Sequence, residues 1–169
     1  MMSKIKIILV EDDEEQRGIF RDSVEVYEEQ YSCEIEVSYA ESLEQANQQI
    51  DLSFDGAIID LQLKDEEEGG NRFAENIIKK FPRIPIIFVT GFPELVDEDN
   101  PLIIKTRARA DGTYAEDLKR LWGIYNTGLT RILGGRGEIE QILDNVFRSN
   151  LLPNLESCVI YGEKDSSRT

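Results

Sequence analysis

The sequence predicts an α/β protein in which helices cover both faces of a parallel β-sheet. Strand-like apolar runs alternate with amphipathic, helix-like segments through the first 105 residues, and this order favours parallel strands joined by right-handed crossovers. The apolar runs are nearly continuous, which is typical of strands buried on both faces. The length of 169 residues fits one such domain with an extension.

Five segments are expected to form the strands. The first, KIKIILV, begins as an alternation of polar and apolar residues and ends as a continuous apolar run, as a strand at the centre of a sheet does. The expected strands cover residues 4–10, 35–39, 54–63, 86–90 and 102–105.

Capping residues mark where the helices between these strands begin. Asp13 is followed by two glutamates in the first helical turn, where the helix dipole favours acidic residues. Ser42 and Gln45 have the spacing of a capping box. A third helix has apolar residues on one face at positions 73, 74, 77 and 78, and Pro82 ends it.

The pattern changes after residue 105. Thr113 and Glu116 form another capping box, and helically spaced apolar residues continue to residue 133, a length of about five to six turns. Glycines then interrupt the pattern, and residues 139–147 are amphipathic again. We therefore expect a main domain over 1–133 and a helical or irregular C-terminal extension over 134–169.

Composition excludes several classes of function. The chain has 34 acidic and 19 basic residues and a net charge of −15, which disfavours binding to nucleic acid or to anionic membranes. It has no histidine, so a Ser-His-Asp triad, a His-ligated zinc site and a phosphohistidine within this chain are excluded. Residues 1–105 hold 25 acidic and 10 basic residues, whereas 106–169 hold nine of each. We expect the functional centre in the acidic part.

Cysteine usage and hydropathy predict a cytoplasmic protein. Cys33 and Cys158 are far apart and outside any CxxC pattern, so we interpret them as reduced thiols. The apolar run over residues 7–10 is too short for a signal peptide or a membrane span.

Polar side chains follow four of the expected strands. Glu11 and Asp12 come after the first, Asp60 interrupts the third, and Thr90 and Lys105 end the fourth and fifth. Parallel strands bring their carboxyl ends to one edge of the sheet, where the three carboxylates would repel one another. Two such charges 4 Å apart cost about 4 kcal/mol at a protein-like dielectric, so we expect a retained proton or a divalent cation, with Mg²⁺ suited to oxygen ligands.

A lysine and a hydroxyl beside such a carboxylate suggest phosphoryl chemistry. Asp60 would be the nucleophile, since carboxylates form aspartyl phosphates. The ammonium of Lys105 would offset the charge on the phosphoryl oxygens, and the hydroxyl of Thr90 would donate to one of them.

Four motifs, KIKIILVEDDEEQR, FDGAIIDLQL, IPIIFVTG and LIIK, resemble the receiver domain of bacterial two-component response regulators. The resemblance covers residues 4–105 and the following helix, and it implies a doubly wound, flavodoxin-like sheet of five strands in the order 2-1-3-4-5. It also implies a phosphoacceptor at Asp60, and Mg²⁺ held by Asp12, Asp60 and the backbone carbonyl of Gln62, with Glu11 acting mainly through water. Thr90 and Lys105 would contact the phosphoryl group, which a sensor histidine kinase or phosphotransfer protein would donate.

The sequence departs from the family pattern after Asp60 and around Lys105. The loop LQLKDEEEGG is long and acidic, Lys64 and Thr106 stand where the family has prolines, and Leu102 stands where a switching aromatic residue is common. Only fourteen residues separate Thr90 from Lys105. We therefore expect the fourth helix of the family to be very short or unwound, within residues 93–100.

The sequence leaves several functions open. The leading interpretation is a non-enzymatic switch without a DNA-binding output domain, in which phosphorylation of Asp60 controls a dimer or partner surface formed by residues 106–169. A pseudo-receiver that binds a partner without being phosphorylated is the alternative. An aspartate-nucleophile phosphatase of the haloacid dehalogenase type is disfavoured, because Gln62 stands where that family has a second aspartate. Each acid could also be structural, at a helix start or in the core.

Overall fold

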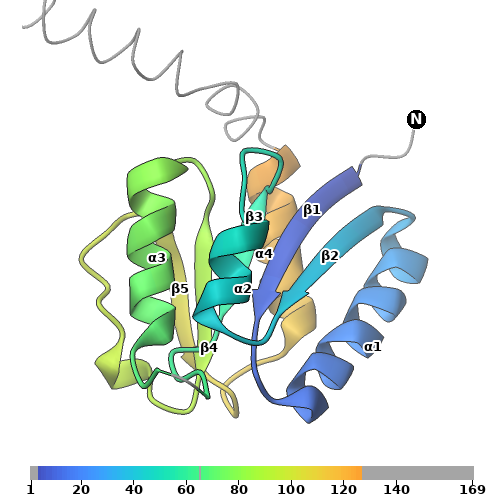
Figure 1. Ribbon diagram of the computed structural model, residues 1–169. Helices are drawn as coiled ribbons and strands as arrows, with labels where there is room; N and C mark the ends of the chain where they lie inside the picture. The colour runs from blue at the N-terminus through green and yellow to red at the C-terminus, as the bar shows by residue number, and fades with distance from the viewer. Residues whose placement is uncertain (1–3, 65, 127–169) are drawn as a thin grey trace, which may run out of the picture. The chain divides into compact units, whose positions relative to one another are not determined.

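Five parallel strands form one sheet in the order β2-β1-β3-β4-β5. The computed structural model describes residues 4–64 and 66–126, and the predicted doubly wound, flavodoxin-like sheet is confirmed within them (Figure 1). The strands are β1 (Lys4–Val10), β2 (Glu34–Ala40), β3 (Gly56–Ile59), β4 (Ile86–Thr90) and β5 (Ile103–Ala108).

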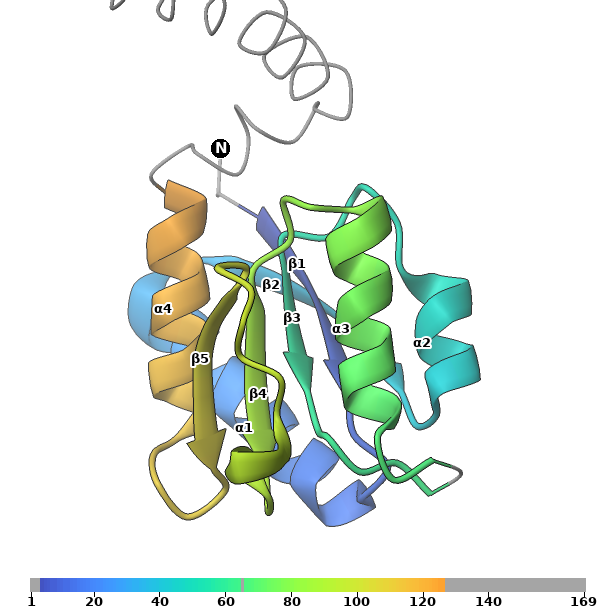
Figure 2. The same ribbon diagram turned by 90° about the vertical axis from the view of Figure 1, so that its left-hand side faces the viewer.

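Helices cover both faces of this sheet. Two of them, α2 and α3, lie on one face, and α1 and α4 lie on the other (Figures 1 and 2). The described helices are α1 (Glu14–Tyr31), α2 (Leu43–Gln49), α3 (Gly69–Lys80) and α4 (Tyr114–Asn126), with a short 3₁₀ helix, η1 (Pro93–Leu95).

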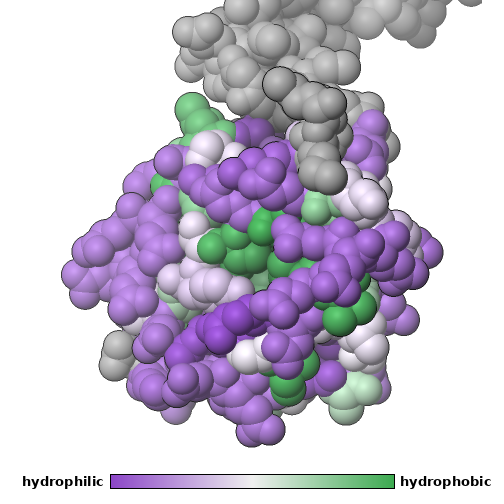
Figure 3. All heavy atoms as spheres, turned by 90° about the vertical axis from the view of Figure 1, so that its right-hand side faces the viewer, coloured by the Kyte–Doolittle hydropathy of each residue, from purple (hydrophilic) through white to green (hydrophobic). Residues whose placement is uncertain are grey.

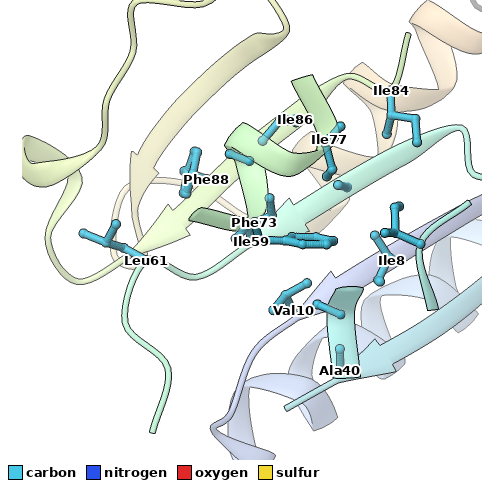
Figure 4. Packing of buried hydrophobic residues seen from close by; sticks show 14 of the residues in the cluster. Ile8, Val10, Ala40, Ile59, Leu61, Phe73, Ile77, Ile84, Ile86 and Phe88 are labelled. Atoms are coloured by element: carbon cyan, nitrogen blue, oxygen red, sulfur yellow. The ribbon is translucent and has the colours of Figure 1, made fainter. Parts of the chain in front are cut away.

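The sheet separates two hydrophobic cores because alternate strand residues point to opposite faces. Ile8, Val10 and Ile59 face α2 and α3, and Phe73 of α3 packs among them (Figure 4). The other core lies under α1 and α4 and includes Phe20 of α1. Each central strand therefore buries both of its faces, which accounts for the continuous apolar runs in the sequence.

The predicted capping residues begin the first two helices. Asp13 is the N-cap of α1, and its side chain accepts a hydrogen bond from the backbone N–H of Glu15 at 2.9 Å. The hydroxyl of Ser42 accepts one from the backbone N–H of Gln45 at 3.2 Å. The side chain of Gln45 accepts in return from the backbone N–H of Glu41 at 2.9 Å, so the end of β2 is tied to the start of α2.

Two strands differ from the sequence-based expectation. β3 is shorter than the predicted 54–63 and ends directly before Asp60. β5 continues to Ala108 instead of ending at residue 105. Between β4 and β5, where the sequence predicts a very short or unwound fourth helix within residues 93–100, the described residues form the 3₁₀ helix η1. The predicted continuation of the last helix to residue 133 and the extension over 134–169 lie outside the described residues.

The free edge of β2 carries charged residues. Lys4 pairs with Glu34 at 3.1 Å and with Glu36 at 2.9 Å. In Figure 3, which views the side where β2 and α1 lie, hydrophilic residues cover most of the surface around a central hydrophobic strip. Charges on an edge strand oppose pairing with another sheet.

Among the described helices, none is long and apolar enough to cross a membrane.

Candidate phosphoryl-acceptor site

Glu11 and Asp60 occupy the same edge of the sheet because both follow a strand directly. β1 ends at Val10 and pairs with β3, which ends at Ile59. The backbone N–H of Asp60 donates to the carbonyl of Val10 at 2.8 Å, which fixes the start of the loop after β3 against the end of β1. This edge is the lower one in Figure 1.

Three carboxyl groups converge there. Glu11, Asp12 and Asp60 each offer an oxygen, and these oxygens lie within 4.8 Å of one another. Glu11 is 1% exposed and Asp60 5%, whereas Asp12 is half-buried. Asp12 and Asp60 line an open cleft of about 770 Å³. The predicted convergence of the three acids is therefore present in the structure.

Arg109 supplies the positive charge at this site. Its Nη2 donates to both carboxylate oxygens of Glu11, at 3.0 and 2.9 Å, and to Oδ2 of Asp60 at 2.7 Å. One guanidinium nitrogen therefore joins acids that follow two different strands. Arg109 comes directly after β5, and its backbone N–H donates to the carbonyl of Thr90 at 3.1 Å.

The placement expected for Lys105 is wrong. Its ammonium contacts Oδ1 of Asp117 in α4, 3.0 Å away. The physical reason is the length of β5. Lys105 lies inside the strand and pairs with Ile87, whose side chain belongs to the core under α1 and α4, so its own side chain projects to that face and not to the carboxyl edge.

The sequence carries a signal for Arg109 that lies outside the four motifs, which end at Lys105. In the run LIIKTRARA, basic residues recur at every second position, 105, 107 and 109. This spacing is typical of a strand that continues with one face charged. A strand of that length places Arg109, and not Lys105, at its carboxyl end.

Burial raises the pKa of both central acids. For Glu11, burial is the largest cause and the neighbouring Asp60 adds to it, and together they raise the pKa to about 7. Burial also raises the pKa of Asp60, while the hydroxyl of Thr90 and the guanidinium of Arg109 act in the opposite direction. The site therefore favours any ligand that supplies further positive charge.

Thr90 and Gln62 also border the site. Thr90 is fully buried at the end of β4, and its hydroxyl accepts a hydrogen bond from the backbone N–H of Phe92 at 3.3 Å. The effect of this hydroxyl on the pKa of Asp60 indicates that the two side chains are neighbours. Gln62 lines the cleft. Thr90 and Gln62 therefore border the site, and their roles towards a phosphoryl group and a metal stay predictions.

The donor set fits a divalent cation such as Mg²⁺. The Oδ1 atom of Asp60 is buried and has no hydrogen-bond partner among the described residues, and an unpaired buried carboxylate oxygen is costly. Asp12 makes no hydrogen bond or ion pair with the described residues and borders the same cleft. Hard oxygen ligands with room for water are what Mg²⁺ requires.

Comparisons with known proteins identify the fold. No protein-family model and no curated protein matches the sequence. Among solved structures, the unphosphorylated HemR receiver domain of Leptospira biflexa is 25% identical, with a TM-score of 0.50, and the match covers 71% of this chain and 93% of that one.

Two other solved structures agree. The receiver domain of the PhyR response regulator of Erythrobacter litoralis has a TM-score of 0.56 at 20% identity, covering 73% of this chain and 92% of that one. Response regulator TrrA of Thermotoga maritima, solved in complex with Mg²⁺ and BeF, has a TM-score of 0.52 at 21% identity, covering 69% and 98%. The described part of this chain therefore has the fold of a response-regulator receiver domain.

Proposed function

We propose that this chain is a response-regulator receiver protein that accepts a phosphoryl group on Asp60 with the help of Mg²⁺ and thereby switches a protein–protein interaction. The observation that supports this most directly is the environment of Asp60. Its carboxyl group is 5% exposed, has one unpaired buried oxygen, and lies beside two further acids and a guanidinium. Most buried polar side-chain atoms in proteins are hydrogen-bonded, so a buried carboxylate oxygen without a partner is unusual.

The proposed reaction is an attack by a carboxylate oxygen of Asp60 on phosphorus. In a phosphohistidine donor the P–N bond breaks, its electron pair leaves with the imidazole nitrogen, and Asp60 becomes an acyl phosphate. Water later attacks this phosphorus, which releases orthophosphate and restores the carboxylate. These 169 residues include no histidine, so the phosphoryl donor lies outside them, for example in a sensor histidine kinase, a phosphotransfer protein or a small acyl phosphate.

The chain's own residues position this reaction. Asp12, Asp60 and the backbone carbonyl of Gln62 would hold Mg²⁺, with Glu11 acting mainly through water. When bound, Mg²⁺ supplies positive charge beside the phosphoryl oxygens. The hydroxyl of Thr90 donates to one of these oxygens. Lys105 is not part of this proposal, because its ammonium is engaged by Asp117.

Intact-mass measurement after incubation with acetyl phosphate and Mg²⁺ tests the proposal. We expect the wild-type protein to gain the mass of one phosphoryl group, and Asp60→Asn and Asp12→Asn to gain none or far less. Asp13→Asn is the matched control, because Asp13 lines the same cleft but belongs to the helix cap, and it should be phosphorylated like wild type. Equal phosphorylation of Asp60→Asn and wild type would refute the assignment.

A pseudo-receiver remains the second candidate, and one observation favours it. The two buried acids are already paired with Arg109, so the site is partly neutralised without a metal. If the wild-type protein gains no phosphoryl mass at saturating acetyl phosphate and Mg²⁺, the pseudo-receiver is the better description.

The switched surface is proposed to lie within residues 106–169. Part of this segment, α4, is integral to the domain, since Tyr114, Leu118, Leu121 and Tyr125 are buried. A truncation that tests the surface therefore has to keep α4 and end after Asn126. We expect the full chain to change its self-association or partner binding upon phosphorylation, and the truncated chain to lose this response. An unchanged response in the truncated chain would contradict the proposal.

A further inference from the structure

A groove lies between α3 and the segment that connects η1 to β5. This segment and α3 are on the side of the molecule that faces the viewer in Figure 2, and residues of both line the groove. Its volume of about 250 Å³ is below the range of pockets that enclose a whole drug-sized ligand. The groove is therefore suited to side chains of a protein segment and not to a small molecule.

The sequence explains why the segment after η1 does not continue as a helix. Glu94 precedes Asp97 by three residues and Glu98 by four, so a helix would place like charges side by side. Pro101 disfavours a helical backbone at Asn100. The helical turn therefore ends after three residues, and the chain that follows forms one wall of the groove.

One side chain holds the two walls of the groove together. Nδ2 of Asn71 in α3 donates to the carbonyl of Leu95 at 3.1 Å, and Oδ1 of Asn71 accepts from the backbone N–H of Asp97 at 3.3 Å. The segment after η1 is thus fixed against α3 before any partner arrives. A preformed groove costs little conformational entropy when it is filled.

Apolar side chains form part of the lining. Ala74 and Ile78 of α3 and Ile103 of β5 line the groove. Ile78 and Ile103 pack against the core under α2 and α3 but remain half-buried. Leu95, whose carbonyl is bonded to the groove residue Asn71, is 55% exposed. Covering such apolar surface is favourable.

The exposed part of the lining is acidic. Asp97 and Asp99 are exposed, and neither forms an ion pair within the part of the chain that the structure describes. Glu75 has a distant partner in Lys79, 4.0 Å away. Within the same described part, acids close enough to share a metal ion gather at Asp60 and not in this groove. The acids of the groove are therefore available to separate cationic groups of a partner.

We propose that this groove is a docking surface for a segment of a partner protein that presents apolar side chains next to lysine or arginine. Residues 92–102 include four acidic residues and no basic one, so this wall complements a basic segment in charge. The apolar residues between the walls accept the apolar side chains, as grooves do that bind amphipathic helices. The docking surface requires neither Mg²⁺ nor phosphorylation of Asp60, and it is separate from the surface proposed within residues 106–169.

Fluorescence anisotropy with a labelled model peptide tests the proposal on the full chain. The probe is a peptide of about 15 residues, with leucines at helical spacing on one face and lysines elsewhere. A shuffled peptide of the same composition lacks the apolar face, and a third peptide has glutamate in place of lysine. We expect the probe to bind and both controls to bind at least about tenfold more weakly, through loss of apolar contact and through repulsion by the acidic domain.

Variants of the acidic wall locate the binding site. Asp97→Asn combined with Asp99→Asn should weaken binding of the probe about fivefold, and asparagine keeps the side-chain oxygen that accepts from the backbone N–H of residue 99. The matched control, Glu25→Gln combined with Glu29→Gln, removes two exposed acids from α1 and should change the affinity less than about twofold. Amide chemical-shift changes on binding should gather in α3 and in residues 96–103.

The apolar part of the groove is tested by Ile78→Ser, which should weaken binding of the probe at least about fivefold. Circular dichroism verifies folding, and the exposed aspartates decide the question should Ile78→Ser fail to fold. No binding of the probe up to about 1 mM, equal binding of the shuffled peptide, equal losses in the two double variants, or shift changes centred outside the groove would each overturn the proposal.

Discussion

Two carboxyl groups, those of Glu11 and Asp60, are buried side by side although each would be better hydrated in water. Burial and their mutual repulsion raise the pKa of Glu11 to about 7. The guanidinium of Arg109 opposes this effect at both groups. Structures retain such arrangements at functional sites, where groups with perturbed pKa values cluster. The charge balance at these three residues is therefore where the site responds to a ligand.

The position of Asp60 depends on a glycine in α3. A Cβ at Gly70 would lie 2.3 Å from the carbonyl oxygen of Asp60 and 2.7 Å from Cα of Leu61, so the helix touches the chain directly after β3. We expect Gly70→Ala to lower the free energy of unfolding by about 2 kcal/mol and to weaken Mg²⁺ binding, because the backbone carrying Asp60 has to move.

Chemical denaturation and Mg²⁺ titration measure these two effects. Gly18→Ala is the control, since nothing lies within 4 Å of a Cβ at that position in α1, and alanine there should stabilise the helix by up to about 1 kcal/mol. A Gly70→Ala protein as stable as wild type would show that the close approach does not constrain the site.

At the scale of elements, β5 and α4 are joined by a buried ion cluster. Asp117 of α4 is fully buried, and Arg107 donates to it through Nε at 2.9 Å and through Nη2 at 2.6 Å. Lys105 contacts the same carboxylate. The cluster sets the position of the strand end that carries Arg109, so α4 is coupled to the site through β5.

Loss of the acid in this cluster should destabilise the domain strongly. Asp117→Asn leaves the buried guanidinium of Arg107 without a counter-charge, and we expect a loss of about 3 kcal/mol in the free energy of unfolding. Glu66→Gln is the comparison, because its ion pair with Arg72 is exposed, and it should cost less than about 1 kcal/mol. Urea denaturation measures both. Equal, small effects would mean that the cluster does not hold β5 against α4.

The sheet and the first two helices could be predicted from the sequence, whereas the end of β5 could not. The continuous apolar runs and the capping residues Asp13 and Ser42 identified the sheet and the first helices, because burial and hydrogen bonding impose strict local patterns. The end of β5 could not be read from hydrophobicity, because its last residues pack through ionic contacts such as that of Arg107 with Asp117. The sequence therefore placed Glu11, Asp12 and Asp60 at the site correctly. It assigned the cation of the site to Lys105, whereas the structure has Arg109 there.

At the scale of the molecule, the excess of acidic residues lowers the stability of the folded state. The net charge of −15 is concentrated in residues 1–105, and self-repulsion of this kind destabilises the compact state. Salt screens the repulsion over a Debye length of about 10 Å at 0.1 M. Any cation therefore stabilises the domain, but only one that enters the cleft acts at Asp12.

The last prediction separates these two effects of cations on stability. We expect the wild-type melting temperature to rise with NaCl and to rise further in MgCl₂ of matched ionic strength, since a ligand at ten times its dissociation constant adds about 1.4 kcal/mol. Asp12→Asn should keep the response to NaCl and lose the additional response to MgCl₂. Differential scanning fluorimetry measures both series. If MgCl₂ adds the same stability to wild type and Asp12→Asn, the cation acts by screening alone and the cleft is not its binding site.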